Sequence, residues 1–250
     1  MSFERVAVGT GIGAEPAPTP RMGDITPTEG ASAAMRLQIL STEHWSLLAT
    51  RSLTYNESLA RVNIFLAILS GAVIALALIA QADHFGRTFV AIAIPVLLIV
   101  FYAGIATISR LMALNQADYR WVIGMNRLRH AYLELHPELE PHFVASPYDD
   151  LHGALQTLGI DIDDVRARRS LGSIFHLPQT LPGMLTVIVA AVAGAIVALG
   201  AVALAAPSPV VALAAVTGFV LVLLVAGIRG RRSLTRLSPS LQPRFPSPPR

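Results

Sequence analysis

Four long apolar runs dominate the sequence, and the charged residues are confined to the segments between and around them. Each run has the ~20 residues that a helix needs to cross a hydrocarbon core of ~30 Å. None of the runs contains Asp, Glu, Arg or His. The pattern predicts an all-α integral membrane protein, a bundle of four transmembrane helices at residues 64–82, 89–108, 184–206 and 209–228.

The arginines predict the orientation of these helices. All 19 basic residues are arginines, and only Arg87 lies in a turn that joins two paired spans. The flanks of membrane helices on the cytoplasmic side are enriched in Arg and Lys. We therefore expect two hairpins in the bacterial inner (cytoplasmic) membrane, with both chain termini in the cytoplasm.

The two hairpins divide the chain into six parts. The Gly- and Pro-rich N-terminal part and the Pro- and Arg-rich C-terminal part are expected to be unstructured, because they cannot bury enough apolar surface to offset the loss of chain entropy. The parts are an N-terminal tail (1–32), a cytoplasmic amphipathic helix (33–63), the first transmembrane hairpin (64–108), a cytoplasmic stalk helix and loop (109–183), the second transmembrane hairpin (184–228) and a C-terminal tail (229–250).

The stalk has a repeating apolar pattern with one polar exception, Asp118. Its apolar residues recur at alternating steps of three and four, which is heptad-like spacing. The pattern predicts that the stalk packs on the 33–63 helix or on another subunit; the alternative is a lone amphipathic helix on lipid. We expect a homo-oligomer or a protein partner to bind residues 110–135, through a contact face of Trp121, Met125, Leu128, Tyr132 and Leu135.

Small residues recur every four positions in three of the predicted spans. Such residues let helix backbones approach closely, which is how helices associate when lipid is as apolar as their side chains. The pattern is compatible with an oligomer interface and, equally, with packing inside one chain. The predicted helix-packing residues are Gly71, Ala75, Ala190, Gly194 and Gly218.

The residue types present do not favour catalysis or cofactor binding. The chain has no cysteine, no phosphate-binding glycine loop and no nucleophile motif. The loop around His136, His142, Asp149 and Asp150 holds potential metal ligands, but their spacing matches no helical metal motif, and a solvated acidic loop is the simpler interpretation. The basic pI of about 9.8 is explained by flanks that face anionic lipid, so the bilayer and not nucleic acid is the expected partner.

Three segments resemble a group of uncharacterised bacterial four-span membrane proteins from high-GC organisms such as actinobacteria. They are TRSLTYNESLARVNIFLAILSGAVIALALIAQ (50–81), YRWVIGMNRLRHAYLELHPELEPHFV (119–144) and YDDLHG (148–153). The plan of residues 35–135 is also similar to the two-span effector domains of bacterial conflict systems, of the SLATT kind. The first resemblance implies a four-span protein and supplies no activity to carry over, and the second implies a membrane effector.

Two functions follow from these observations. The first is a non-enzymatic membrane scaffold or interaction protein that acts through its cytoplasmic helices, with no cofactor. The alternative is an oligomeric pore or membrane-disrupting effector, since small and hydroxyl-bearing residues can line a pore formed by several copies.

Overall fold

A computed structural model describes residues 29–159, 180–235 and 242–248 of the chain. The described residues form helices, turns and short irregular segments, and no strand occurs among them. Four of the helices are long and apolar enough to cross a membrane. The prediction of an all-α helical bundle with four apolar spans is therefore confirmed.

The first hairpin consists of two very long helices. Helix α1 (Glu29–Asp83) has 55 residues and α2 (Arg87–Leu135) has 49, which correspond to lengths of about 80 Å and 75 Å. Each helix therefore extends well beyond the ~30 Å of a hydrocarbon core. The turn between them is closed by Asp83, whose carboxylate accepts a hydrogen bond from the Phe89 backbone N–H at 2.7 Å.

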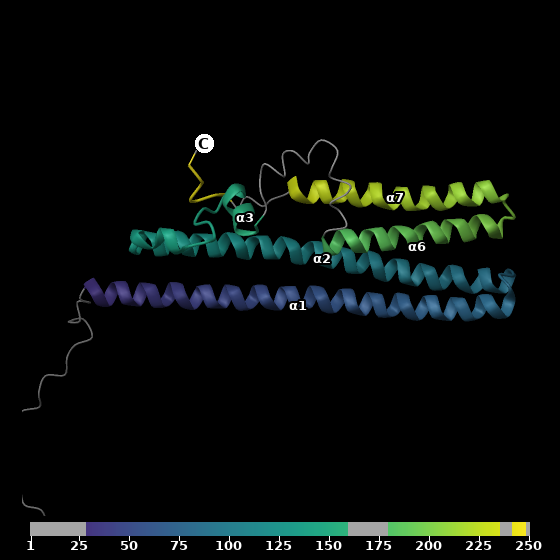
Figure 1. Cartoon of the computed structure of the whole chain (residues 1–250), viewed down its shortest axis with the longest axis horizontal. Helices are drawn as coiled ribbons and strands as arrows, with labels where there is room; N and C mark the ends of the chain where they lie inside the picture. Colours follow the sequence, from purple (N-terminus) through teal and green to yellow (C-terminus); the bar gives the residue numbers. More distant parts are fainter. Residues whose placement is uncertain (1–28, 160–179, 236–241, 249–250) are drawn as a thin grey trace, which may run out of the picture.

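The second hairpin is shorter and packs on α2. Helix α6 (Leu181–Ala203) begins at Thr180, whose hydroxyl accepts a hydrogen bond from the Gly183 N–H at 3.2 Å, and α7 (Ser208–Thr235) follows after a tight turn. Helix α6 contacts both α2 and α7, so the four helices are arranged in the order α1, α2, α6, α7. Both hairpin turns lie at the same end of the molecule, and the extended parts of α1 and α2 project at the other (Figure 1).

The core of the spans lies where α1, α2 and α6 meet. Phe65, Val100 and Val189 are almost completely buried there. Gly104 makes this close approach feasible, because a Cβ atom at that position would overlap Val189 Cγ2 and would lie 3.1 Å from Phe65 Cε2. The outer helix α7 is more exposed than α6: 6% of the most apolar stretch of α7 is buried, whereas 39% of that of α6 is buried.

The projecting part of α2 carries a small folded platform. It contains the 3₁₀ helix η1 (Pro137–His142) and the short helix α3 (Leu151–Thr157), both of which pack on α2. The acidic segment 161–164 and the basic segment 166–169 lie outside the described residues.

The expectation of an unstructured tail over 229–250 is wrong for two parts of it. Helix α7 continues to Thr235, and residues 242–248 lie against the platform. A proline-rich composition argues against a buried apolar core, but it does not exclude hydrogen bonds to the main chain. Residues 242–248 are held by such bonds with Asp149 and Asp150. Most of the N-terminal tail lies outside the described residues, and α1 begins at Glu29, before the predicted start at residue 33.

Candidate functional site

The stalk is a paired structure in which α1 covers the heptad-like seam of α2. Asp118, the polar exception in that seam, accepts a hydrogen bond from Arg51 Nε at 2.7 Å. Farther along, Met125 is 2% exposed and packs in a cluster with Leu47 of α1. Tyr132 stacks on His44 with ring centroids 5.9 Å apart. The stalk is expected to pack either on the 33–63 helix or on another subunit. In the structure it packs on the helix of the same chain.

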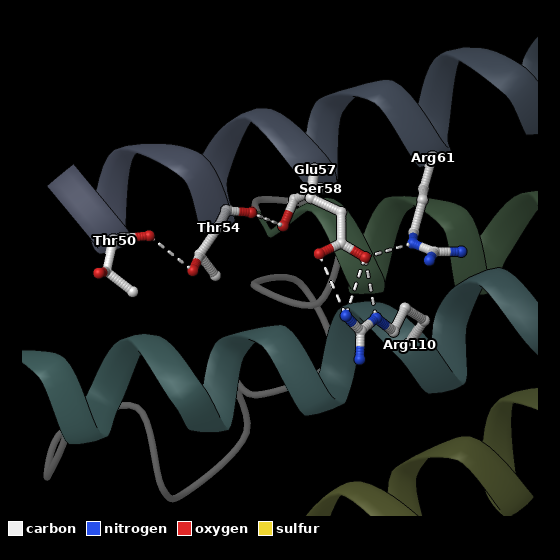
Figure 2. A network of polar contacts seen from close by, with 6 residues as sticks. All are labelled: Thr50, Thr54, Glu57, Ser58, Arg61 and Arg110. Atoms are coloured by element: carbon white, nitrogen blue, oxygen red, sulfur yellow. Dashed lines mark hydrogen bonds and ion pairs between the residues drawn. The ribbon is translucent and has the colours of Figure 1, made fainter.

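A second group of charges joins the two helices nearer the membrane. Glu57 of α1 accepts hydrogen bonds from Arg61 at 2.8 Å and from Arg110 of α2 at 3.0 and 3.1 Å (Figure 2). These hydrogen bonds, first that from Arg61 and then that from Arg110, lower the pKa of Glu57. Arg61 lies just before the apolar run of α1, and Arg110 lies just after that of α2. This cluster therefore lies at the boundary between the stalk and the apolar spans.

The platform is attached to α2 by a buried asparagine. The Asn126 side chain is fully buried, and its amide donates to the Tyr148 carbonyl at 2.7 Å. Its oxygen accepts from Thr157 Oγ1 at 2.9 Å and from Arg129 at 2.7 Å. A buried polar group that is hydrogen-bonded to several neighbours holds them in one arrangement. Asn126 therefore fixes Tyr148, just before Asp149 and Asp150, and Thr157, at the end of α3.

Close packing within the platform requires a glycine. A Cβ atom on Gly153 would overlap the Tyr148 carbonyl oxygen and would lie 2.9 Å from Ser146 Oγ. Its N–H donates to the carboxylate of Asp150, which caps the first turn of α3. These contacts bring two adjacent carboxylates to one edge of the platform.

Asp149 binds the main chain of the C-terminal segment. Its carboxylate, which is completely buried, accepts from the backbone N–H of Arg244 at 2.9 Å and from that of Phe245 at 2.8 Å. Its own N–H donates to the Phe245 carbonyl at 3.1 Å. Three contacts thus hold one short stretch of backbone, which bends at Arg244 and Phe245.

Two side chains of α2 complete this site. Arg127 donates to Asp149 at 2.7 Å and, through a second nitrogen, to the Gln242 carbonyl at 3.2 Å. His130 stacks on the Phe245 ring, with centroids 3.9 Å apart and an angle of 24° between the planes. The arginine thus both compensates the buried carboxylate and contacts the bound segment, while the imidazole provides a flat surface for an aromatic residue.

Asp150 binds the segment two residues beyond Phe245, at Ser247. It accepts from the Ser247 N–H at 3.1 Å and from the Ser247 hydroxyl at 2.8 and 2.7 Å, in addition to the cap on α3. We call the surface formed by Arg127, His130, Asp149 and Asp150 the tail site. It contacts the backbone, one aromatic ring and one hydroxyl of residues 242–248.

The charge state of the tail site follows from these contacts. Burial alone would raise the pKa of Asp149, but hydrogen bonds from Arg244, Arg127 and Phe245 outweigh it, so the pKa is lowered. Burial opposes ionisation of Asp150 in the same way, and the bonds from Ser247 and Gly153 lower its pKa as well. Both carboxylates are therefore ionised at neutral pH and act as acceptors only.

The residues predicted for a contact face occupy different environments. Met125 is buried against α1, and Tyr132 is half-buried between His44 and Phe143. The other three are half-buried. While the hairpin is intact, Met125 is not accessible to a partner. A glutamate at this position would therefore disrupt the packing of α1 on α2 before it affected any partner. The half-buried members of this face are Trp121, Leu128, Tyr132 and Leu135.

The predicted helix-packing residues separate into two groups. Ala190, Gly194 and Gly218 lie inside the chain: a Cβ atom on Gly194 would lie 2.8 Å from the Ala215 carbonyl, and one on Gly218 would lie 3.1 Å from the Ala193 carbonyl. Gly71 and Ala75 are exposed on α1, and a Cβ atom on Gly71 would meet nothing within 4 Å. The same spacing thus serves intramolecular packing in α6 and α7 and leaves an open face on α1.

Sequence reasoning considered Asp149 and Asp150 as metal ligands and did not identify their role in binding the tail. Among the described residues, no group of three or more His, Asp or Glu side chains could hold a metal ion. It also did not identify Asn126 and Arg127. Their signal was the group of polar residues Asn126, Arg127, Arg129 and His130, which follows an apolar stretch of α2, and Phe245 is the single large apolar residue of the Pro-rich tail after Leu241.

Comparison with known proteins adds no relative: no family model, curated protein or solved structure matches the chain. Its function is therefore argued from its own residues.

Proposed function

We propose that this membrane protein is a non-enzymatic interaction protein whose stalk binds short peptide segments at the tail site. The stalk lies on the cytoplasmic side in this proposal, because the Arg-rich flanks favour that orientation. The observation that carries the proposal is the pairing of Asp149 with the backbone of residues 244–245. The C-terminal segment is then one occupant of a site that a partner segment can also fill.

The chemistry of the tail site supports recognition of such segments. Backbone hydrogen bonds supply affinity without requiring a particular sequence, and individual side-chain positions supply specificity. Here His130 selects an aromatic residue, and Asp150 selects a hydroxyl or another donor two positions later. We therefore expect partner segments to carry an aromatic residue and to lack acidic residues next to it.

The attached tail makes the site selective. A covalently tethered segment on a short linker has an effective concentration of about 1 mM or more. A free partner segment must therefore bind more tightly than the tail, or be presented in many copies, in order to replace it. The tail would restrict binding to such partners.

The proposal is tested with the peptide of residues 242–248, labelled with a fluorophore, and the chain in lipid nanodiscs. A chain truncated after Leu241 should bind the peptide saturably, by fluorescence anisotropy. The full chain should bind at least tenfold more weakly, because its own tail competes. The same truncation with Asp149→Asn should bind the peptide roughly 30-fold more weakly, because one hydrogen bond to a charged group is lost. Glu138→Gln, which changes an exposed carboxylate outside the site, should leave binding unchanged. Failure of the truncated chain to bind would refute the proposal.

A second function, an oligomeric pore or membrane-disrupting effector, is favoured by one observation. Gly71 and Ala75 form an open small-residue face on α1, with Ser70 and Asn63 also exposed on this helix. Several copies packed through this face would place hydroxyl and amide groups near a common axis. Flux from dye-loaded liposomes that rises steeply with protein and is lost in Gly71→Leu, but not in Gly200→Leu, would favour the pore. Tight vesicles at all protein densities would exclude a constitutive pore.

A further inference from the structure

A large cavity lies between the two hairpins and opens beside their apolar spans. Its volume is about 730 Å³, within the range of ~300–1,000 Å³ found for ligand pockets. The walls come from α2 and α7, and the first turn of α6 forms one end. Small residues create the space, because Gly183, Ala226, Gly227 and Gly230 line it and a Cβ atom on Gly227 would meet nothing within 4 Å.

The lining changes from apolar to polar along the cavity. Phe101, Ile105 and Leu221 line the part within the spans. Ser109, Asn115 and Arg229 line the part at the Arg-rich end, just beyond the apolar runs of α2 and α7. Arg229 is exposed, and it forms no ion pair with any residue that the structure describes. Arg110, which follows the apolar run of α2, is in contrast paired with Glu57.

From this arrangement we infer that the cavity binds one anionic phospholipid of the leaflet on the Arg-rich side. An apolar groove open to the bilayer has no water to fill it, and an acyl chain regains the dispersion contacts that the small residues leave unmade. The phosphate lies at Arg229, since a guanidinium forms strong paired hydrogen bonds with phosphate oxygens. Basic pockets between helices on the cytoplasmic side are known sites for anionic headgroups. This inference is independent of the tail site.

Two pairs of variants separate the acyl-chain site from the headgroup site. Gly227→Leu fills the cavity, and its control is Gly200→Leu, because Gly200 is equally free of neighbours but lies on α6 outside the cavity. Arg229→Gln removes the charge at the mouth, and its control is Arg120→Gln, an exposed arginine on the stalk.

The full-length protein is reconstituted with equal amounts of phosphatidylglycerol and phosphatidylcholine, and the lipids that remain bound are counted by native mass spectrometry. The wild-type chain should retain one phosphatidylglycerol. Gly227→Leu should lower its occupancy at least tenfold, and Arg229→Gln should lower the preference for phosphatidylglycerol about tenfold, while both controls behave as wild type.

Retention of the lipid by Gly227→Leu, or an equal loss in Gly200→Leu, would overturn the acyl-chain site. The folding of Gly227→Leu is judged by its elution in gel filtration and by its thermal unfolding. If this variant does not fold, the lipid preference of Arg229→Gln becomes the test of the inference. An unchanged lipid preference in that variant would overturn the headgroup site. Displacement of the lipid by millimolar inorganic phosphate would also contradict the inference, because the acyl chain would then contribute nothing.

Discussion

Replacing Asp149 by asparagine should release the C-terminal segment while keeping the shape of the tail site. One carboxylate oxygen accepts from Arg127 Nε and the Arg244 N–H, and the other accepts from the Phe245 N–H. An amide offers one oxygen and one NH₂ group. At least one of these donors would therefore face another donor, and the charge that strengthens all three bonds would be lost.

The expected magnitude follows from the number of bonds affected. A hydrogen bond to a charged group contributes about 1.5–3 kcal/mol. Loss of one such bond in Asp149→Asn should shift the equilibrium between bound and released tail by about 2 kcal/mol, or roughly 30-fold. The other contacts of the segment, from Asp150 and His130, remain in place.

Hydrogen–deuterium exchange of the full chain in nanodiscs measures this shift. The backbone amides of Arg244 and Phe245 should exchange roughly 30-fold faster in Asp149→Asn than in the wild type. The matched control is Glu138→Gln, since that carboxylate lies on the same platform but is exposed and does not contact the segment. Equal protection of these amides in Asp149→Asn and the wild type would refute the role of Asp149.

Three further predictions concern pH, packing and topology. The bound tail lowers the pKa of Asp149, so the ionised carboxylate stabilises the bound tail fully at any pH above the ordinary pKa of an Asp side chain. This stabilisation is lost as the pH falls through the lowered pKa. Protection of the tail amides from exchange should therefore decrease below about pH 4. Gly194→Leu should cost about 1–3 kcal/mol and lower the Tm in detergent, whereas Gly71→Leu should leave the Tm unchanged, because only the first position is packed against backbone. Phe85→Cys in the turn between α1 and α2 should react with an impermeant maleimide added outside whole cells, and Arg120→Cys only after lysis; the reverse pattern would invert the proposed topology.

The spans could be predicted from sequence because hydropathy is a local property of about 20 consecutive residues. The partner of a polar seam residue is not local: Asp118 pairs with Arg51, which is 67 positions earlier. The heptad-like spacing therefore located the packed face of the stalk but left open whether the same chain or another one covers it.

The small-residue pattern and the tail show a second limit of prediction from sequence. Gly71 and Gly194 have the same four-residue spacing, yet one is exposed and the other is packed against α7. Spacing identifies a helix face, whereas the order of the helices decides what covers that face. Similarly, the composition of residues 242–248 predicts no core of its own, and their order depends on carboxylates almost 100 positions away.

The central claim is that the C-terminal segment occupies the tail site in the membrane-embedded protein. The chain has no cysteine, so His130→Cys and Phe245→Cys together introduce its only thiols. Their side chains are in stacking contact in the structure, and the backbone bonds to Asp149 do not depend on either one. Mild oxidation in native membranes should give a disulfide within one chain, and the pair Arg120→Cys and Phe245→Cys should give none. Thiols that stay free in the first pair, or that link only different chains, would contradict the account.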